Sequence, residues 1–173
     1  IKNSIYKTYL ACDAVSEEIL LSHHYRCNEK IIAFNNQKYY NNKLVINSQS
    51  QADTPLIFKN IAGNTTNYKN TAPREAEEII EFIKDNPDKS IGVITPFTNQ
   101  KELIHAMLQE NGMKDVPCGT VHAFQGDEKD VVLFSLALTE QTGQGTYDWL
   151  KNNKELINVA TPRAKEQLVI PFL

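Results

Sequence analysis

The sequence predicts an α/β domain in which helices flank a mostly parallel β-sheet. Short apolar runs alternate with segments of helical period, which is the pattern of such a sheet. Several runs are apolar on consecutive residues, as expected of strands buried on both faces. A length of 173 residues, with 41% hydrophobic and 23% charged residues, is typical of one globular domain. We therefore expect residues 1–173 to form a single domain and to be a fragment of a larger protein.

The expected strands are short. Six runs qualify: Ile19–Leu21, Leu56–Phe58, Ile91–Thr95, Cys118–Val121, Val131–Leu138 and Gln167–Ile170. Even Val131–Leu138 is far shorter than the ~20 apolar residues that span a bilayer. We expect no membrane partner.

Four helices are expected between these strands. Asn28 can cap the first, which runs to about Tyr40. The second begins near Pro73, a residue that suits a first helical turn. The third follows Phe97 and stops at Gly112. The fourth runs from about Tyr147 toward Val159.

The second helix has the clearest two-sided pattern. Its apolar stripe consists of Ala76, Ile79, Ile80 and Ile83. Its glutamates are expected to face water or the helix start: Glu75, Glu77, Glu78 and Glu81. Arg74 lies on this acidic helix and is interpreted as one half of a surface ion pair.

Charge and cysteine content exclude several classes of protein. The net charge is −3, so we expect any nucleic-acid contact to be a local groove that another domain can complete. Three cysteines without a C-x-x-C pattern predict neither a zinc site nor a disulfide framework, and a reducing cytoplasm fits best. His23 and His24 are adjacent and point apart, so we expect no metal site. No G-x-x-x-x-G-K-[ST] segment occurs, so the chain holds no P-loop for a triphosphate.

Arginine is rare in this chain. Only three of the 18 basic residues are arginine: Arg26, Arg74 and Arg163. Lysine cannot copy the planar, bidentate geometry of a guanidinium group. An arginine kept in such a lysine-rich chain points to a role that needs this geometry. From the residues alone, Arg26 fits a phosphate contact and a structural ion pair about equally well.

Four polar patterns fall in order along the α/β frame. They are HYRCNE at 24–29, ITPFTNQ at 94–100, GTVHAFQGDEKD at 119–130 and NVATPRAK at 158–165. The first two stand where a strand leads into a helix, a position at which α/β folds bind anions. The third is a dense polar turn between two strands, which packs poorly and indicates a ligand.

These patterns resemble those of superfamily 1B helicases, in the branch of the nonsense-mediated-decay helicase and senataxin. The resemblance runs from about Leu21 to Ile170. It implies the second RecA-like domain, a three-layer fold that is P-loop NTPase-like but has no P-loop of its own. It also implies ATP and Mg²⁺ bound mainly by an N-terminal RecA-like domain, and single-stranded DNA or RNA as a partner. This chain alone is expected to be monomeric and to hydrolyse no ATP.

The resemblance also implies roles for individual residues. Arg26 and Arg163 match two catalytic arginines that reach the γ-phosphate. Nucleotide contacts are implied for Tyr25, Arg26, Gln125, Gly126, Glu128 and Arg163. Contacts to the nucleic-acid backbone are implied at or beside Thr95, Pro96, Asn99, Thr120 and His122.

The main departure from the family pattern is Pro162, which stands where the family has serine or threonine. Proline within a helix costs about 3 kcal/mol or more, so Arg163 keeps its aim only if the helix ends before it. This departure motivates an alternative hypothesis, a non-hydrolysing nucleic-acid clamp or scaffold. A third hypothesis is a free-standing domain that binds a small ligand.

Overall fold

The computed structural model describes residues 23–48, 50, 52–61, 69–121, 124 and 128–172. The strand expected at Ile19–Leu21 lies outside these residues. The described chain is built around a five-stranded sheet in the order β3-β7-β6-β4-β5. Every neighbouring pair in it is parallel, which confirms the predicted sheet. The strands are β3 Leu56–Asn60, β4 Ile91–Thr95, β5 Cys118–Thr120, β6 Lys129–Phe134 and β7 Ala164–Phe172.

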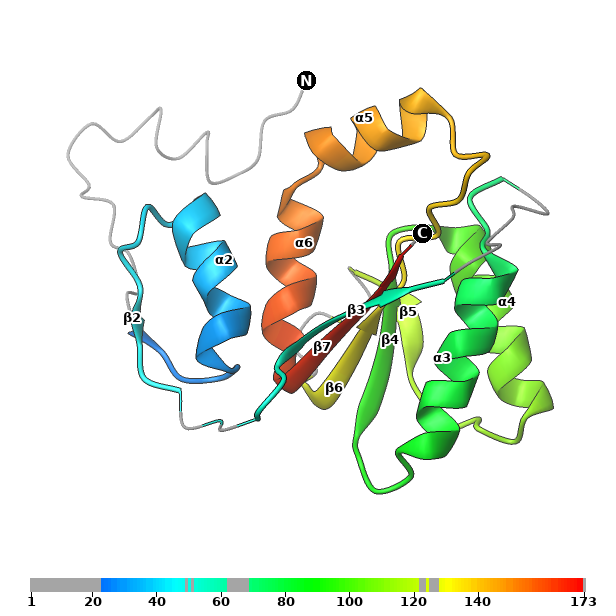
Figure 1. The fold of residues 1–173 in the computed structure, drawn as a ribbon, viewed down its shortest axis with the longest axis horizontal. Coiled ribbons are helices and arrows are strands. Elements are labelled where there is room, and N and C mark those ends of the chain that lie inside the picture. The colour runs from blue at the N-terminus through cyan, green and yellow to red at the C-terminus, as the bar shows by residue number, and fades with distance from the viewer. Residues whose placement is uncertain are drawn as a thin grey trace, which may run out of the picture.

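Helices cover both faces of this sheet (Figure 1). On one face lie α3, Pro73–Asp85, and α4, Thr98–Glu110, packed on Val93, Leu133 and Val169. On the other lie α2, Glu29–Tyr39, and α6, Glu155–Ala160, packed on Ile94, Phe134 and Leu168. Neighbouring strand residues thus enter opposite cores, which explains why the strands are apolar at consecutive positions.

The remaining elements lie outside these layers. β1, His23–His24, and β2, Val45–Ile46, form a separate two-stranded parallel sheet. The 3₁₀ turn η1, Thr161–Arg163, joins α6 to β7. Helix α5, Gln144–Asn152, runs along one edge of the molecule and has no buried residue (Figure 1). Within the described residues, no helix combines the length and apolar character needed to cross a membrane.

Two sequence-based expectations need correction, and a third is decided between its alternatives. The helix expected from Tyr147 to Val159 is two helices, because Asn153 donates its amide to the Trp149 carbonyl (2.6 Å) and ends α5. The strand expected at Val131–Leu138 ends at Phe134, and Ala137 has a positive φ of 50° that belongs to a turn. Of the two positions expected for Glu75, water or the helix start, Glu75 takes the helix start, where it is buried in the first turn of α3.

Candidate functional site

Arg26 and Arg163 line the same cavity, which has a volume of about 450 Å³. Arg26 comes from the turn between β1 and α2, and Arg163 from the end of η1, directly before β7. Tyr25 and Pro162 also line it. The structure therefore brings together two arginines that are far apart in the sequence.

One residue explains why these two segments meet. The Asn28 side chain caps α2 by accepting a hydrogen bond from the Lys30 N–H (3.0 Å). The Asn28 backbone N–H donates to the Lys165 carbonyl (3.0 Å). This hydrogen bond fixes the start of α2 to the start of β7. Arg26 is two residues before Asn28 and Arg163 is two residues before Lys165, so the same bond brings the two arginines close together.

Arg26 is exposed and held by an ion pair. Its Nε lies 3.3 Å from Oε1 of Glu128, and 63% of its side chain is accessible. Glu128 stands directly before β6, the strand beside β7. Because exposed pairs of this kind contribute little free energy, an incoming anion can draw Arg26 away from Glu128 at small cost.

Arg163 is half-buried and has an unused donor. Its Nε atom is buried and has no hydrogen-bond partner among the described residues. Buried donors are rarely left without a partner, since the lost hydration is costly. Arg163 also lines the cavity, so an anion that binds there and shifts this side chain can supply the missing acceptor.

Pro162 does not distort this arrangement. Helix α6 ends at Ala160, and Pro162 occupies the first turn of η1, where a missing N–H is tolerated. The Thr161 hydroxyl anchors the turn, because it accepts from the Asn35 amide (2.6 Å) and donates to the Ile157 carbonyl (2.9 Å). The condition for Arg163 to keep its aim, a helix that ends before the proline, is met.

Burial shifts the pKa of two side chains in the segment that carries Arg26, His24 and Cys27. Burial, followed by the charge of Arg26, lowers the pKa of His24, whose Nε2 accepts from the Cys27 N–H (3.2 Å). Burial raises the pKa of the Cys27 thiol to about 12. A thiol with this pKa is no nucleophile at neutral pH. Among the described residues, no cluster of His, Cys, Asp and Glu could hold a metal ion.

The residues expected to contact nucleic acid lie at the other end of the sheet, where β4 and β5 have their carboxyl ends. Thr95 ends β4 and Thr120 ends β5, and their Cα atoms are partners in the parallel ladder. Pro96 and Asn99 line a second cavity of about 790 Å³ at this edge. Thr95 itself is fully buried, and its hydroxyl accepts from the Phe97 N–H (3.3 Å), so it shapes the turn that carries Pro96. His122, Gln125 and Gly126 lie outside the described residues.

Three buried polar residues, Gln100, Ser135 and Glu75, lie close to the segments that line this second cavity. Gln100 accepts from the Ala72 N–H (2.8 Å) and donates to the Ser135 hydroxyl (3.0 Å). Glu75 is 1% exposed, and within the described part of the chain neither of its carboxylate oxygens has a hydrogen-bond partner at normal distance and angle. Burial raises the pKa of Glu75 to about 8, against the opposite influence of the Ser135 hydroxyl and nearby backbone N–H groups.

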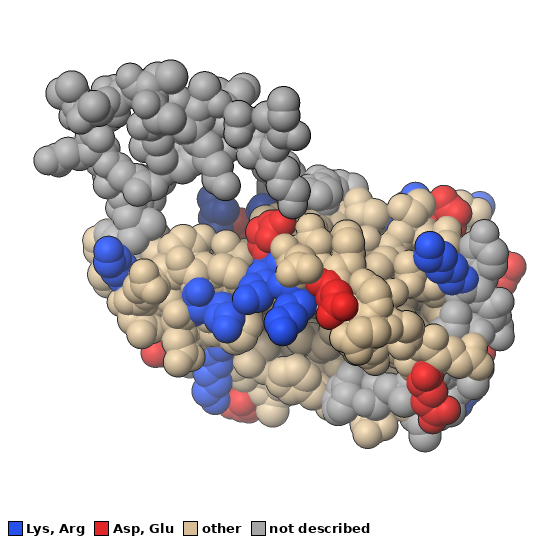
Figure 2. All heavy atoms as spheres, turned by 90° about the horizontal axis from the view of Figure 1, so that it is seen from above, with Lys and Arg blue, Asp and Glu red and all other residues tan. Residues whose placement is uncertain are grey.

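Sequence reasoning missed the part of the second cavity that comes from other segments. Lys69, Asn70 and Trp149 line it together with Pro96 and Asn99. Trp149 is the single tryptophan of the chain, which is a sequence signal, but only the fold places it beside α4. Seen from the side of α5, basic side chains gather near the middle with acidic ones directly beside them, and the described surface in view carries no wide basic field (Figure 2).

Comparison with known proteins defines the class. The AAA domain family matches residues 1–171, and the chain belongs to this family. It is 29% identical over 180 residues to an uncharacterized ATP-dependent helicase of Methanocaldococcus jannaschii, covering 87% of this chain and 26% of the relative. It is 31% identical over 186 residues to the DNA polymerase alpha-associated DNA helicase A of Saccharomyces cerevisiae, covering 84% and 26%. The chain thus spans about a quarter of the length of these relatives.

The fold has a counterpart among solved structures. The C-terminal domain of a possible DNA helicase from Lactobacillus plantarum WCFS1 aligns with a TM-score of 0.54 at 15% identity, covering 86% of this chain and 87% of that one. At this identity the likeness concerns the fold alone. Together with the family match, it confirms the resemblance to a superfamily 1 helicase domain.

Proposed function

We propose that this chain is the second motor domain of an ATP-dependent superfamily 1 helicase. In this proposal, an N-terminal RecA-like domain of the same protein holds ATP and Mg²⁺, and Arg26 and Arg163 reach the γ-phosphate across the cleft. One observation carries the proposal: both arginines line one cavity, and Arg163 presents a buried Nε with no partner among the described residues. The chain by itself, without a P-loop, hydrolyses no ATP.

The two arginines would contribute in different ways. Arg163 is already fixed by η1 and the anchored Thr161, so it costs little reorganisation when charge develops on the phosphoryl group. Arg26 would leave its exposed pair with Glu128 when the cleft closes. In this proposal, the rest of the nucleotide is contacted by Glu128, Tyr25, Gln125 and Gly126.

The carboxyl end of the sheet would bind a single strand of DNA or RNA. Pro96, Asn99 and Thr120 stand at the carboxyl ends of β4 and β5, with His122 next along the chain. Contacts of this kind position a strand without reading its sequence. Because the two sites lie at opposite ends of one parallel sheet, a closing movement at the arginines would move the nucleic-acid site with them as a rigid unit.

The test measures nucleic-acid-stimulated ATP hydrolysis by the complete protein to which this domain belongs. Arg26→Ala and Arg163→Ala are each expected to lower the rate, by up to the ~10³–10⁵-fold ascribed to arginine fingers. Arg74→Ala is the matched control, because Arg74 is an exposed arginine paired with Glu77 away from the cavity. Unchanged rates in both cavity variants, or an equal loss in the control, would refute the proposed mechanism.

A further inference from the structure

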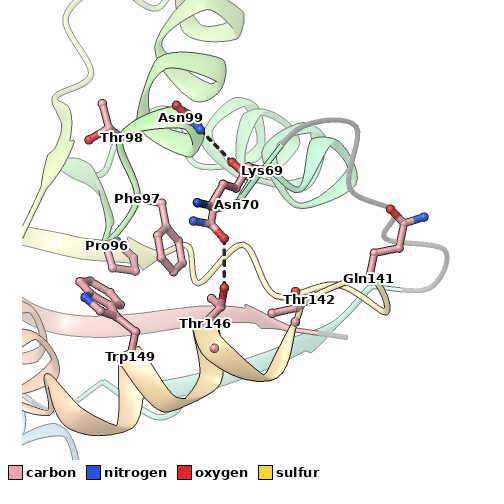
Figure 3. Close-up of a pocket in the computed structure, with 12 residues that line it drawn as sticks. Lys69, Asn70, Pro96, Phe97, Thr98, Asn99, Gln141, Thr142, Thr146 and Trp149 are labelled. Atoms are coloured by element: carbon pink, nitrogen blue, oxygen red, sulfur yellow. Dashed lines mark hydrogen bonds between the residues drawn. The ribbon is translucent and has the colours of Figure 1, made fainter.

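The second cavity, at the carboxyl end of the sheet, is lined by an aromatic pair from two distant segments. Phe97, directly before α4, and Trp149, in α5, have ring centroids 5.5 Å apart and planes inclined by 39°. Phe97 is only 8% exposed, whereas Trp149 is 42% exposed. Figure 3 shows these two rings and Pro96 together on one side of the cavity. Phe97 thus supports one part of the indole and leaves the rest open to the cavity.

Burial in the core does not explain this tryptophan. Helix α5 has no buried residue, and its neighbour Leu150 already packs against the small cluster of Ala72, Phe97 and Ala137. A single exposed aromatic side chain is common and indicates nothing alone. Here, however, the exposed ring is backed by a second ring and faces a preformed cavity of about 790 Å³. This combination is typical of a ligand pocket.

Hydrogen bonds hold the other walls of the cavity in place. The Asn99 amide donates to the Lys69 carbonyl (2.8 Å), which ties the segment before α3 to α4. The Thr146 hydroxyl donates to Asn70 Oδ1 (3.3 Å), which ties the same segment to α5 (Figure 3). Three segments are therefore fixed relative to one another before any ligand binds, which lowers the entropic cost of binding.

The charge of the lining favours a phosphodiester over a basic ligand. Among the described residues that line the cavity, Lys69 is the one charged side chain, and the others are amides, hydroxyls, glycines and apolar groups. A nucleotide offers a flat ring that stacks on an indole and an anionic backbone that Lys69 attracts. The same cavity contains Pro96 and Asn99, which the proposed function places along the strand.

We infer that this cavity receives one unpaired base of the bound strand and that Trp149 is the stacking platform for it. The inference rests on the proposed function, because it assumes that a single strand crosses this edge of the sheet. It adds a contact that acts on the base and not on the backbone. Every base has a flat face, so the contact would be tolerant of sequence.

The test compares binding of labelled single strands of dT and of rU to the complete protein by fluorescence anisotropy. Trp149→Ala is expected to weaken binding about 5- to 150-fold, and Trp149→Phe to retain most of the affinity. The matched control is Tyr147→Ala, because Tyr147 is on the same helix and 43% exposed but does not line the cavity. The strand on which the loss appears, dT, rU or both, identifies the source of the base.

A strand of abasic sites separates stacking from a structural effect. On that strand the protein and Trp149→Ala should bind equally, and the salt dependence of binding should be the same for both, because no phosphate contact is removed. A loss that persists on the abasic strand, or an equal loss in Tyr147→Ala, would overturn the inference. Unchanged binding in Trp149→Ala refutes the stacking role but leaves the proposed function intact, whereas no binding of any strand by the unmodified protein refutes the proposed function.

Discussion

The buried carboxyl of Glu75 makes the stability of this domain depend on pH in a direction that can be calculated. The pKa of Glu75 is raised from 4.5 to about 8 by burial at the start of α3. Between these two values the folded chain holds a proton that the unfolded chain releases. The free energy of unfolding therefore falls as the pH rises through this window.

The magnitude follows from the two pKa values. Between pH 5 and pH 8 the contribution of Glu75 to the free energy of unfolding falls by about 3.5 kcal/mol. This is an upper bound, since water entry and local relaxation relieve part of the burial cost. The lowered pKa of His24 acts in the opposite direction, because its neutral form is favoured in the fold and stability is lost as the pH falls below 6.5.

Glu75→Gln isolates this effect, because glutamine keeps the size of the side chain and its neutral state. Urea denaturation gives the free energy of unfolding of this chain and of the variant at pH 5 and at pH 8. The difference between the two proteins is taken at each pH. Comparing these two differences cancels the contribution of His24 and of every other group that both proteins share. We expect the unmodified chain to lose up to about 3 kcal/mol more than the variant over this range. Glu81→Gln, an exposed change on the same helix, should behave like the unmodified chain. A difference that does not vary with pH, or a variant that is relatively less stable at pH 8, would show that Glu75 is ionised in the fold.

Two further predictions concern the packing of β4 and the turn that contains Pro162. Gly92→Ala places a Cβ 2.8 Å from the Phe124 ring and 3.0 Å from the Lys129 side chain, so we expect a loss of about 1–3 kcal/mol by thermal denaturation. Gly145→Ala meets nothing within 4 Å and should leave the melting temperature nearly unchanged. Pro162→Thr should change the ATPase rate of the complete protein by less than about twofold, because α6 already ends at Ala160. A large gain in rate would instead favour the clamp or scaffold hypothesis.

The local pattern of the sequence was sufficient for the layered fold. Apolar residues at consecutive positions predicted buried parallel strands, and Val93 and Ile94 indeed enter opposite cores. The stripe of Ala76, Ile79, Ile80 and Ile83 predicted the buried face of α3. Such periods are set by the geometry of a single helix or strand, so they can be recognised without knowing what packs against them.

The candidate site was predictable only in part. The rarity of arginine and the ordered patterns singled out Arg26 and Arg163 from the sequence, and the structure places both on one cavity. Their roles at a γ-phosphate stay a prediction. Thr95 was expected near the nucleic acid, but its side chain is fully buried and supports the turn before α4. The sequence around the last residue of a strand does not reveal whether its side chain points into the core or toward solvent.

The sequence by itself determined most of the helices and strands, the burial of the strands on both faces, and which two arginines to examine. Only the tertiary structure decided that Glu75 is buried in the interior and that α6 ends before Pro162. It also decided that Trp149 packs against Phe97, at the end of the sheet opposite the arginines. These features depend on contacts between segments that are distant along the chain. Local propensity carries no information about which partners meet, because that choice is made by the packing of the whole domain.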